Sequence, residues 1–173
     1  MTAQGDHFAT LGLPRSFELS SQQIEDNYLA RSRELHPDYH RMGADSEQRA
    51  SMELTASLNE AYSTLRDPFQ RAEHLLTLEG GPSAAEMKNL APEFLEETLE
   101  LRMEIEMLRN TQDADGIEAM EQQLLKRKRD LLDQIGAHFQ QLDESREPTL
   151  HRIRELLNAT RFVQGLLRDL YSD

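Results

Sequence analysis

The chain has 173 residues, of which 38% are hydrophobic and 29% are charged, and its formal net charge is −13 at pH 7. It contains no cysteine, which excludes disulfides, thiolate nucleophiles and cysteine metal sites. The negative charge would repel a phosphate backbone, so we expect no nucleic-acid binding. No apolar run of about eighteen residues occurs, and residues 1–6 lack a basic segment followed by an apolar stretch. The sequence therefore predicts neither a membrane span nor a secretory signal.

The beginning of the chain is expected to form a short helix and then a helical hairpin. His7, Phe8 and Leu11 favour the short helix, which Gly12 and Pro14 would end. A helix-start pattern follows at residues 20–23, where a serine precedes a glutamine by three positions.

The hairpin would consist of one helix that ends near residue 36 and a second from about residue 47 to residue 66. The second helix has one apolar stripe, formed by Leu54, Leu58, Ala61, Tyr62 and Leu65. Two such helices joined by a tight loop should pack antiparallel and bury their stripes against each other.

The tripeptide His36-Pro37-Asp38 lies between these two helices. A proline disfavours helix in the residue before it, so the first helix should stop near His36 and expose the tripeptide at the hairpin tip. His36 and His40 have the spacing of a metal pair, but Pro37 breaks the helical geometry. An exposed tip also offers no pocket for a His36–Asp38 catalytic dyad. We therefore expect a partner surface there, with no metal and no catalysis.

Arginines gather near the tripeptide in an otherwise acidic chain. They are Arg31, Arg33 and Arg41. One interpretation is that they only keep the surface soluble. The other is a local basic patch that steers association with an acidic groove of a partner.

A second domain follows the hairpin. A helix over about residues 69–78 precedes a break at residues 80–83, where two glycines, a proline and a serine follow one another. Three long helical patterns then run over about 91–110, 115–142 and 147–171. Because the connectors between them are short, the sequence predicts an antiparallel three-helix bundle.

The domain boundaries follow from this break. We expect an N-terminal domain at 1–79, a linker at 80–90 and the bundle at 91–173. The basic run at 126–129 lies within the bundle and has acidic neighbours, so we expect a solvated and partly paired face.

The first bundle helix carries two apolar stripes. One consists of Leu90, Phe94, Leu101, Ile105 and Leu108, and it is expected to be bundle core. The other consists of Leu95, Leu99, Met103 and Met107, with Glu96, Glu100 and Glu104 between the stripes. The second stripe either contacts the third helix or forms an exposed apolar strip with acidic flanks, which would mark a protein interface.

Residues 6–14, the His-Pro-Asp tripeptide and residues 59–68 together resemble the J-domain family, which stimulates ATP hydrolysis by DnaK-class chaperones. Tyr39 departs from the family, because many members carry lysine there. The resemblance implies a chaperone-binding surface formed by His36, Pro37, Asp38, Asn27, Arg31, Arg33 and Arg41.

The whole chain also resembles the HscB family of co-chaperones in bacterial iron–sulfur cluster assembly. The resemblance continues through Pro68-x-x-Arg71-Ala72-x-x-Leu75-Leu76 and Phe94-Leu95-Glu96-x-x-Leu99-Glu100-Leu101-Arg102. It implies an all-α, L-shaped, cytoplasmic monomer without cofactor. It also implies two partners, the chaperone HscA at the tripeptide and the scaffold IscU on the bundle. The implied IscU-binding residues are Leu95, Glu96, Leu99, Glu100, Arg102, Met103 and Phe162.

The sequence leaves three hypotheses about function to compare. The leading one is a co-chaperone that is not an enzyme, which delivers IscU to HscA and stimulates its ATPase. The alternative is a general J-domain co-chaperone for unfolded clients, but the Gly/Phe-rich and zinc-ribbon segments expected of one are missing. The third is a carboxylate enzyme, which we disfavour because the glutamates have mixed spacings and form no convergent pocket. On the leading hypothesis, Leu95, Leu99 and Phe162 should form one exposed apolar patch.

Overall fold

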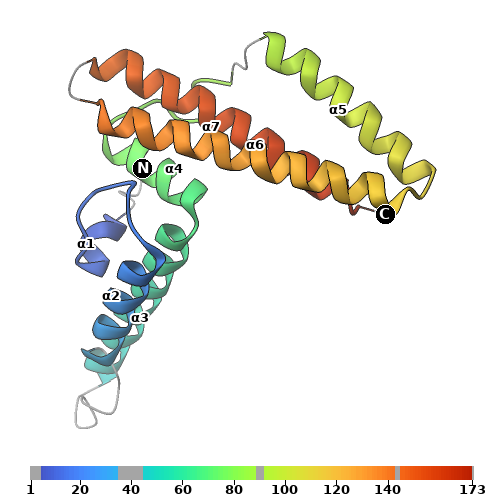
Figure 1. Ribbon diagram of the computed structural model, residues 1–173. Helices are drawn as coiled ribbons and strands as arrows, with labels where there is room; N and C mark the ends of the chain where they lie inside the picture. The colour runs from blue at the N-terminus through green and yellow to red at the C-terminus, as the bar shows by residue number, and fades with distance from the viewer. Residues whose placement is uncertain (1–4, 35–44, 89–91, 143–144, 173) are drawn as a thin grey trace. The chain divides into compact units, whose positions relative to one another are not determined.

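The computed structural model describes residues 5–34, 45–88, 92–142 and 145–172, and the regular structure of this part is all helical (Figure 1). The helices are α1 (His7–Leu11), α2 (Ser21–Glu34), α3 (Asp45–Arg66), α4 (Pro68–Leu78), α5 (Pro92–Asn110), α6 (Ala114–Gln140) and α7 (Arg146–Asp169). The prediction of an all-α fold is confirmed. The chain divides into two compact units, Met1–Leu78 and Glu79–Asp173, which we describe separately.

Both ends of α1 are fixed by local chemistry. At its start, the Asp6 carboxylate accepts hydrogen bonds from the backbone N–H groups of Phe8, at 3.0 Å, and Ala9, at 3.2 Å. At its end, Gly12 takes a left-handed conformation with φ of 68°, which a side chain would strain. The predicted short helix is confirmed at this position.

The start of α2 is a reciprocal capping box. The Ser20 hydroxyl accepts from the Gln23 backbone N–H at 3.1 Å, and the Gln23 side chain accepts from the Ser20 backbone N–H at 2.9 Å. This pairing agrees with the helix start that the sequence indicates.

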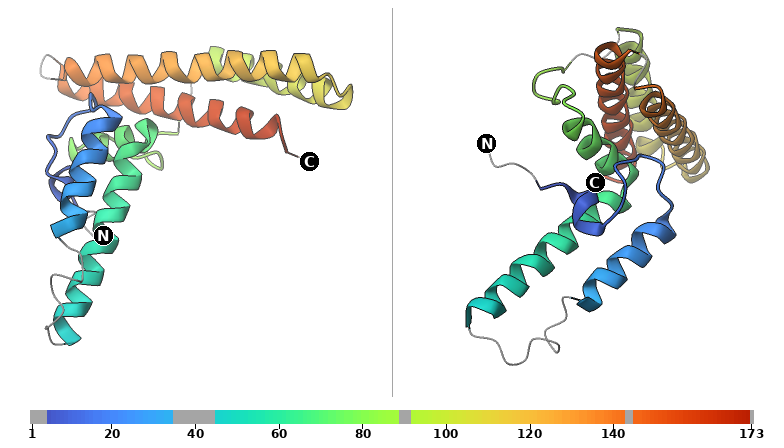
Figure 2. Two further views of the ribbon diagram at one scale, coloured as in Figure 1. Left: turned by 60° about the horizontal axis from the view of Figure 1, so that its bottom comes forward. Right: turned by 90° about the vertical axis from the view of Figure 1, so that its left-hand side faces the viewer.

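Helices α2 and α3 lie side by side and antiparallel, as Figure 2 shows. The core of this unit includes Phe8, Leu11, Ile24, Leu58, Ala61, Leu65, Ala72 and Leu76. Burying each large apolar side chain contributes roughly 1.5–3 kcal/mol before entropy is counted. Leu54 was expected in this stripe but is 54% exposed, so that prediction is wrong. It lies one turn before Leu58, nearer the start of α3, and α2 ends at about this level of the antiparallel pair.

In the second unit, α6 and α7 pack antiparallel along most of their length, and α5 lies against both (Figure 1). The expected helix ends differ from the observed ones by two residues or fewer, which is the usual uncertainty of helix ends. The turn into α6 brings α5 very close, because a Cβ placed on Gly116 would meet the Leu108 side chain at 2.5 Å. A larger residue at this position would therefore require the Leu108 and Asp113 side chains to move.

The core of the bundle forms as the sequence predicts, with some side chains at its edge. The buried members include Leu101, Ile105, Leu124, Ile135, Ile153, Leu157, Val163 and Leu166. Phe94, which was expected in the core, is half-buried, and so are Leu125, Leu132, Phe139 and Leu167. Leu90 was also expected in the core but lies outside the described residues.

The segment between α4 and α5 was expected to be a polar linker, and the structure anchors much of it on α7. Arg146 donates to the Glu79 carbonyl at 3.0 Å, Arg154 donates to the Pro82 carbonyl at 2.9 Å, and Asn158 donates to the Met87 carbonyl at 2.8 Å. Arg154 is only 1% exposed. Because an arginine keeps its charge when buried, hydrogen bonds of this kind are needed to offset its desolvation.

Candidate protein interfaces

The first candidate interface comprises the tripeptide and the basic residues near it. His36, Pro37, Asp38 and Arg41 lie outside the described residues, so their predicted roles stay predictions. Asn27, Arg31 and Arg33 lie on α2. Asn27 and Arg31 contact another segment of the first unit, whereas Arg33 is exposed.

Asn27 and Arg31 both contact the turn that follows α1. The Asn27 amide donates to the Gly12 carbonyl at 3.5 Å. The Arg31 guanidinium packs on Gly12 so closely that a Cβ there would lie 2.9 Å from its Nη2 atom. Arg31 also pairs with Glu34 at 3.5 Å. Arg33 is exposed and pairs with no carboxylate in the described part of the chain. It is therefore the more available of the two cations on α2.

A tyrosine pair, which the sequence did not reveal as a unit, fixes α2 against α3. The rings of Tyr28 and Tyr62 stack with centroids 4.2 Å apart. Tyr28 donates to the Asn59 side chain at 3.0 Å, and Tyr62 donates to the Glu25 carboxylate. That hydrogen bond raises the pKa of Tyr62. These bonds hold the helix that carries Arg31 and Arg33.

Two buried histidines lie where α1 meets α4. His7 and His74 are 4% and 5% exposed, and their ring centroids are 4.3 Å apart. The His7 backbone N–H donates to His74 Nε2 at 3.1 Å, which requires the unprotonated nitrogen there. Burial, and then the neighbouring His7, lowers the pKa of His74. The pair is a structural contact that neutral pH favours.

The second candidate interface is the outer face of α5. Leu95, Leu99, Met103 and Met107 are 50%, 63%, 64% and 58% exposed, and we call them the α5 strip. They lie opposite the buried Leu101, Ile105 and Leu108, as 100° per residue requires. The sequence left two interpretations of this stripe open, and the structure decides that it faces solvent. Four large apolar side chains exposed in one row are typical of a docking surface.

Charged residues flank the α5 strip on both sides. Glu96, Glu100 and Glu104 are exposed along one edge. Arg102 lies on the other, because a residue seven positions after Leu95 is displaced by only about 20° around the helix. Arg102 and the three glutamates thus lie on opposite edges of the strip. Complementary charges on a partner with an apolar surface would favour one orientation of binding.

Phe162 of α7 is half-buried, not exposed as expected. Its ring meets Phe94 edge-on at 6.1 Å between centroids, and the Arg102 guanidinium lies 5.0 Å from its centroid. These neighbours partly cover the ring. The patch that the sequence predicts therefore consists mainly of α5 residues, with Phe162 at its margin.

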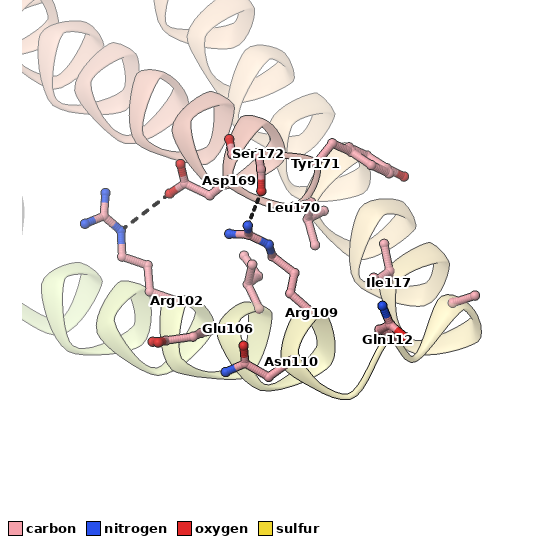
Figure 3. A pocket seen from close by; sticks show the side chains of 12 residues that line it. Arg102, Glu106, Arg109, Asn110, Gln112, Ile117, Asp169, Leu170, Tyr171 and Ser172 are labelled. Carbon is pink, nitrogen blue, oxygen red and sulfur yellow. Dashed lines mark hydrogen bonds and ion pairs between the residues drawn. The ribbon is translucent and has the colours of Figure 1, made fainter.

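An open groove of about 910 Å³ lies between the end of α5, the start of α6 and the end of α7 (Figure 3). Arg102 reaches from α5 to the Asp169 carboxylate of α7 at 3.9 Å, and Arg109 donates to the Ser172 carbonyl. These contacts tie α5 to the end of α7. Within the described residues, no group of three or more His, Asp or Glu could hold a metal ion. None of the helices there is long and apolar enough to cross a membrane.

Two family models match the chain one after the other. Residues 6–74 match the DnaJ domain, and residues 90–170 match the HSCB C-terminal oligomerisation domain. The J-domain model thus covers most of the first unit, and the second model covers all three bundle helices.

Curated relatives and solved structures agree with these matches. A co-chaperone protein HscB homolog of Burkholderia vietnamiensis is 33% identical over 137 residues, which are 79% of this chain and 78% of the relative. The co-chaperone protein HscB of Proteus mirabilis is 35% identical over 113 residues, and the match spans 65% of either protein. The structure of chaperone HscB from Vibrio cholerae has a TM-score of 0.78 and 27% identity, and covers 96% of this chain and 95% of that one. Human co-chaperone HscB, at 22% identity and a TM-score of 0.81, covers 98% of this chain and 82% of the human one and shows the same fold.

Proposed function

Because the chain belongs to the HscB family of J-domain co-chaperones, we propose that it serves iron–sulfur cluster assembly by delivering an IscU-type scaffold protein to HscA, a chaperone of the DnaK class. It stimulates the ATPase of that chaperone and performs no chemistry itself. We further propose that it acts as a monomer in the bacterial cytoplasm.

The chaperone side of this proposal rests on the first unit. In the sequence, His36-Pro37-Asp38 begins two positions after Glu34, the last residue of α2, and Arg33 is an exposed cation on the last turn of that helix. A cation there would steer the acidic chaperone surface toward the tripeptide. Asp38 would then pair with a cationic group of the chaperone.

The observation that carries the scaffold side is the exposed α5 strip. Folding leaves Leu95, Leu99 and Met103 in water, each at least half exposed, although the bundle core is formed without them. A partner that buries them gains apolar contact that the free protein lacks. Glu96, Glu100 and Arg102 would set the orientation of the scaffold, and Phe162 would border the contact.

The direct test is the steady-state ATPase of HscA with this protein, with and without the scaffold. The proposal predicts that the two proteins together stimulate ATP hydrolysis more than the sum of their separate effects. If any unfolded peptide replaces the scaffold with equal effect, the protein is a general J-domain co-chaperone and the proposal is wrong.

A further inference from the structure

The half of α5 that carries Leu95 and Leu99 has little apolar core beneath it. Among the described side chains of α5, the buried apolar ones are Leu101, Ile105 and Leu108, which lie at its midpoint or after it. Among residues 94–100, only Thr98 is buried, and its hydroxyl donates to the Phe94 carbonyl of the same helix. Some other contact must therefore hold this half of α5 at a defined angle.

Four side chains from all three bundle helices supply that contact. Arg127 of α6 lies 5.1 Å from the centroid of the Phe94 ring of α5, and Phe94 meets Phe162 of α7 edge-on. The Arg102 guanidinium of α5 in turn lies 5.0 Å from the centroid of the Phe162 ring. We call this series the arginine–phenylalanine ladder. A guanidinium over an aromatic face and an edge-on aromatic pair are both attractive geometries, so each step of the ladder is stabilising.

Ion pairs fix both ends of the ladder. Arg127 donates through both terminal nitrogens to the Glu97 carboxylate, with 2.5 Å between Nη2 and Oε2. At the other end, Arg102 reaches the Asp169 carboxylate of α7, which Figure 3 shows as a contact across the groove. A two-pronged arginine–carboxylate pair restricts direction as well as distance. The ladder thus joins α5 to α6 on one side and to α7 on the other.

We propose that the arginine–phenylalanine ladder sets the rotation of α5 and thereby presents Leu95 and Leu99 to the scaffold, so that Arg127 is a positioning residue for scaffold binding. This inference rests on the proposed function. Arg127 reaches α5 at Glu97, which lies about 160° around the helix from Leu99 and so faces α6, away from the strip. Its effect on binding is therefore exerted through α5.

The test is the affinity for the scaffold, measured by titration calorimetry on the full chain with Arg127→Gln. The matched control is Arg152→Gln, because Arg152 is also an arginine of this unit in an exposed ion pair, with Glu155 at 2.7 Å. We expect Arg127→Gln to weaken binding roughly threefold to thirtyfold, the range for residues that act through a network. Arg152→Gln should leave the affinity unchanged, and Arg127→Lys, which keeps the charge, should restore part of the loss.

Two further measurements separate positioning from general stability and from direct contact. In the free protein, Arg127→Gln should speed amide hydrogen exchange over residues 95–103, and Arg152→Gln should not. In a double-mutant cycle with Leu99→Ala, Arg127→Gln should reduce the affinity for the scaffold by a smaller factor than it does in the parent protein. The reason is that the leucine side chain that Arg127 positions is already absent. Unchanged exchange in α5, or additive costs, would overturn the positioning role.

The same experiment distinguishes the two proposals. If Leu99→Ala alone leaves scaffold binding intact, the scaffold site itself is wrong, and the inference about Arg127 is wrong with it. If Leu99→Ala weakens binding but Arg127→Gln does not, the scaffold site stands and only the ladder's role is refuted.

Discussion

The two candidate interfaces differ in how far their residues also serve folding. In the first unit, Asn27 and Arg31 hold the turn at Gly12, so these residues are part of the structure. In the second unit, Leu95 and Leu99 face solvent and leave the core to other side chains. Substitutions of Asn27 and Arg31 should therefore mix effects on stability with effects on binding. Substitutions in the α5 strip should separate them.

The largest effect is expected at Asp38 in the proposed chaperone contact. Asp38→Asn removes one partner of the proposed charge pair, which typically costs about 2–5 kcal/mol of binding. The Asp38→Asn variant should no longer stimulate the ATPase of HscA, and His36→Gln should behave likewise. In both variants, the free energy of unfolding obtained from circular dichroism melts should change by no more than about 0.5 kcal/mol. If Asp38→Asn recovers full stimulation at a modestly higher concentration, the charge pair is minor.

A pair of leucines on α5 gives the next comparison. Leu101→Ala empties a site that is 8% exposed in the core and should cost roughly 2–5 kcal/mol of unfolding free energy. Leu99→Ala, two residues earlier, should change that free energy by no more than about 0.5 kcal/mol but cost more than about 1 kcal/mol of scaffold binding. Denaturant unfolding and calorimetry on both variants test this, and a large loss of stability in Leu99→Ala would mean that the strip is core.

The buried His74 predicts that the stability of the first unit depends on pH. His74 is surrounded by His7, Asp6 and Arg15, and burial lowers its pKa. A histidine whose pKa is lowered by folding stabilises the folded state in its neutral form. Its contribution to the free energy of unfolding is therefore complete above the unfolded pKa of about 6.5 and is lost as the pH falls. His74→Leu should reduce this slope of stability against pH. An unchanged slope in His74→Leu would contradict the assignment.

The smallest effects are expected from the arginines of α2. Arg33→Ala should leave stability within about 0.5 kcal/mol but slow association with the chaperone, most clearly at low salt. Arg31→Ala should also lower stability, by up to about 1 kcal/mol, because it loses an ion pair and its packing on Gly12. Stopped-flow association and thermal melts distinguish the two, and equal melts for both variants would show that the contact with Gly12 is unimportant.

The sequence predicted the helices because their apolar residues recur at helical spacing and their ends carry recognisable caps. The capping box of Ser20 and Gln23 and the core at Leu101, Ile105 and Leu108 follow from such local rules. The exposure of the α5 strip did not follow, since periodicity places residues on a face without saying what covers that face.

The sequence also did not predict contacts between side chains that lie far apart along the chain. Arg127 lies in a basic run expected to be a solvated face, and Lys126 does pair with Asp130 at 2.8 Å, but Arg127 reaches Glu97 and Phe94 on another helix. Arg154 lies under the segment expected to be a linker. Phe162 is covered by Phe94 and Arg102. These contacts depend on how helices pack, and no local pattern specifies that.

The proposed function requires both interfaces on one chain, and mixing two defective variants tests this requirement. Asp38→Asn should still bind the scaffold, and Leu95→Ala/Leu99→Ala should still contact HscA. If delivery requires both interfaces on the same molecule, an equimolar mixture of the two will not restore the joint stimulation of the HscA ATPase by co-chaperone and scaffold. Restoration of the full joint stimulation by the mixture would show that the two interfaces need not lie on the same molecule.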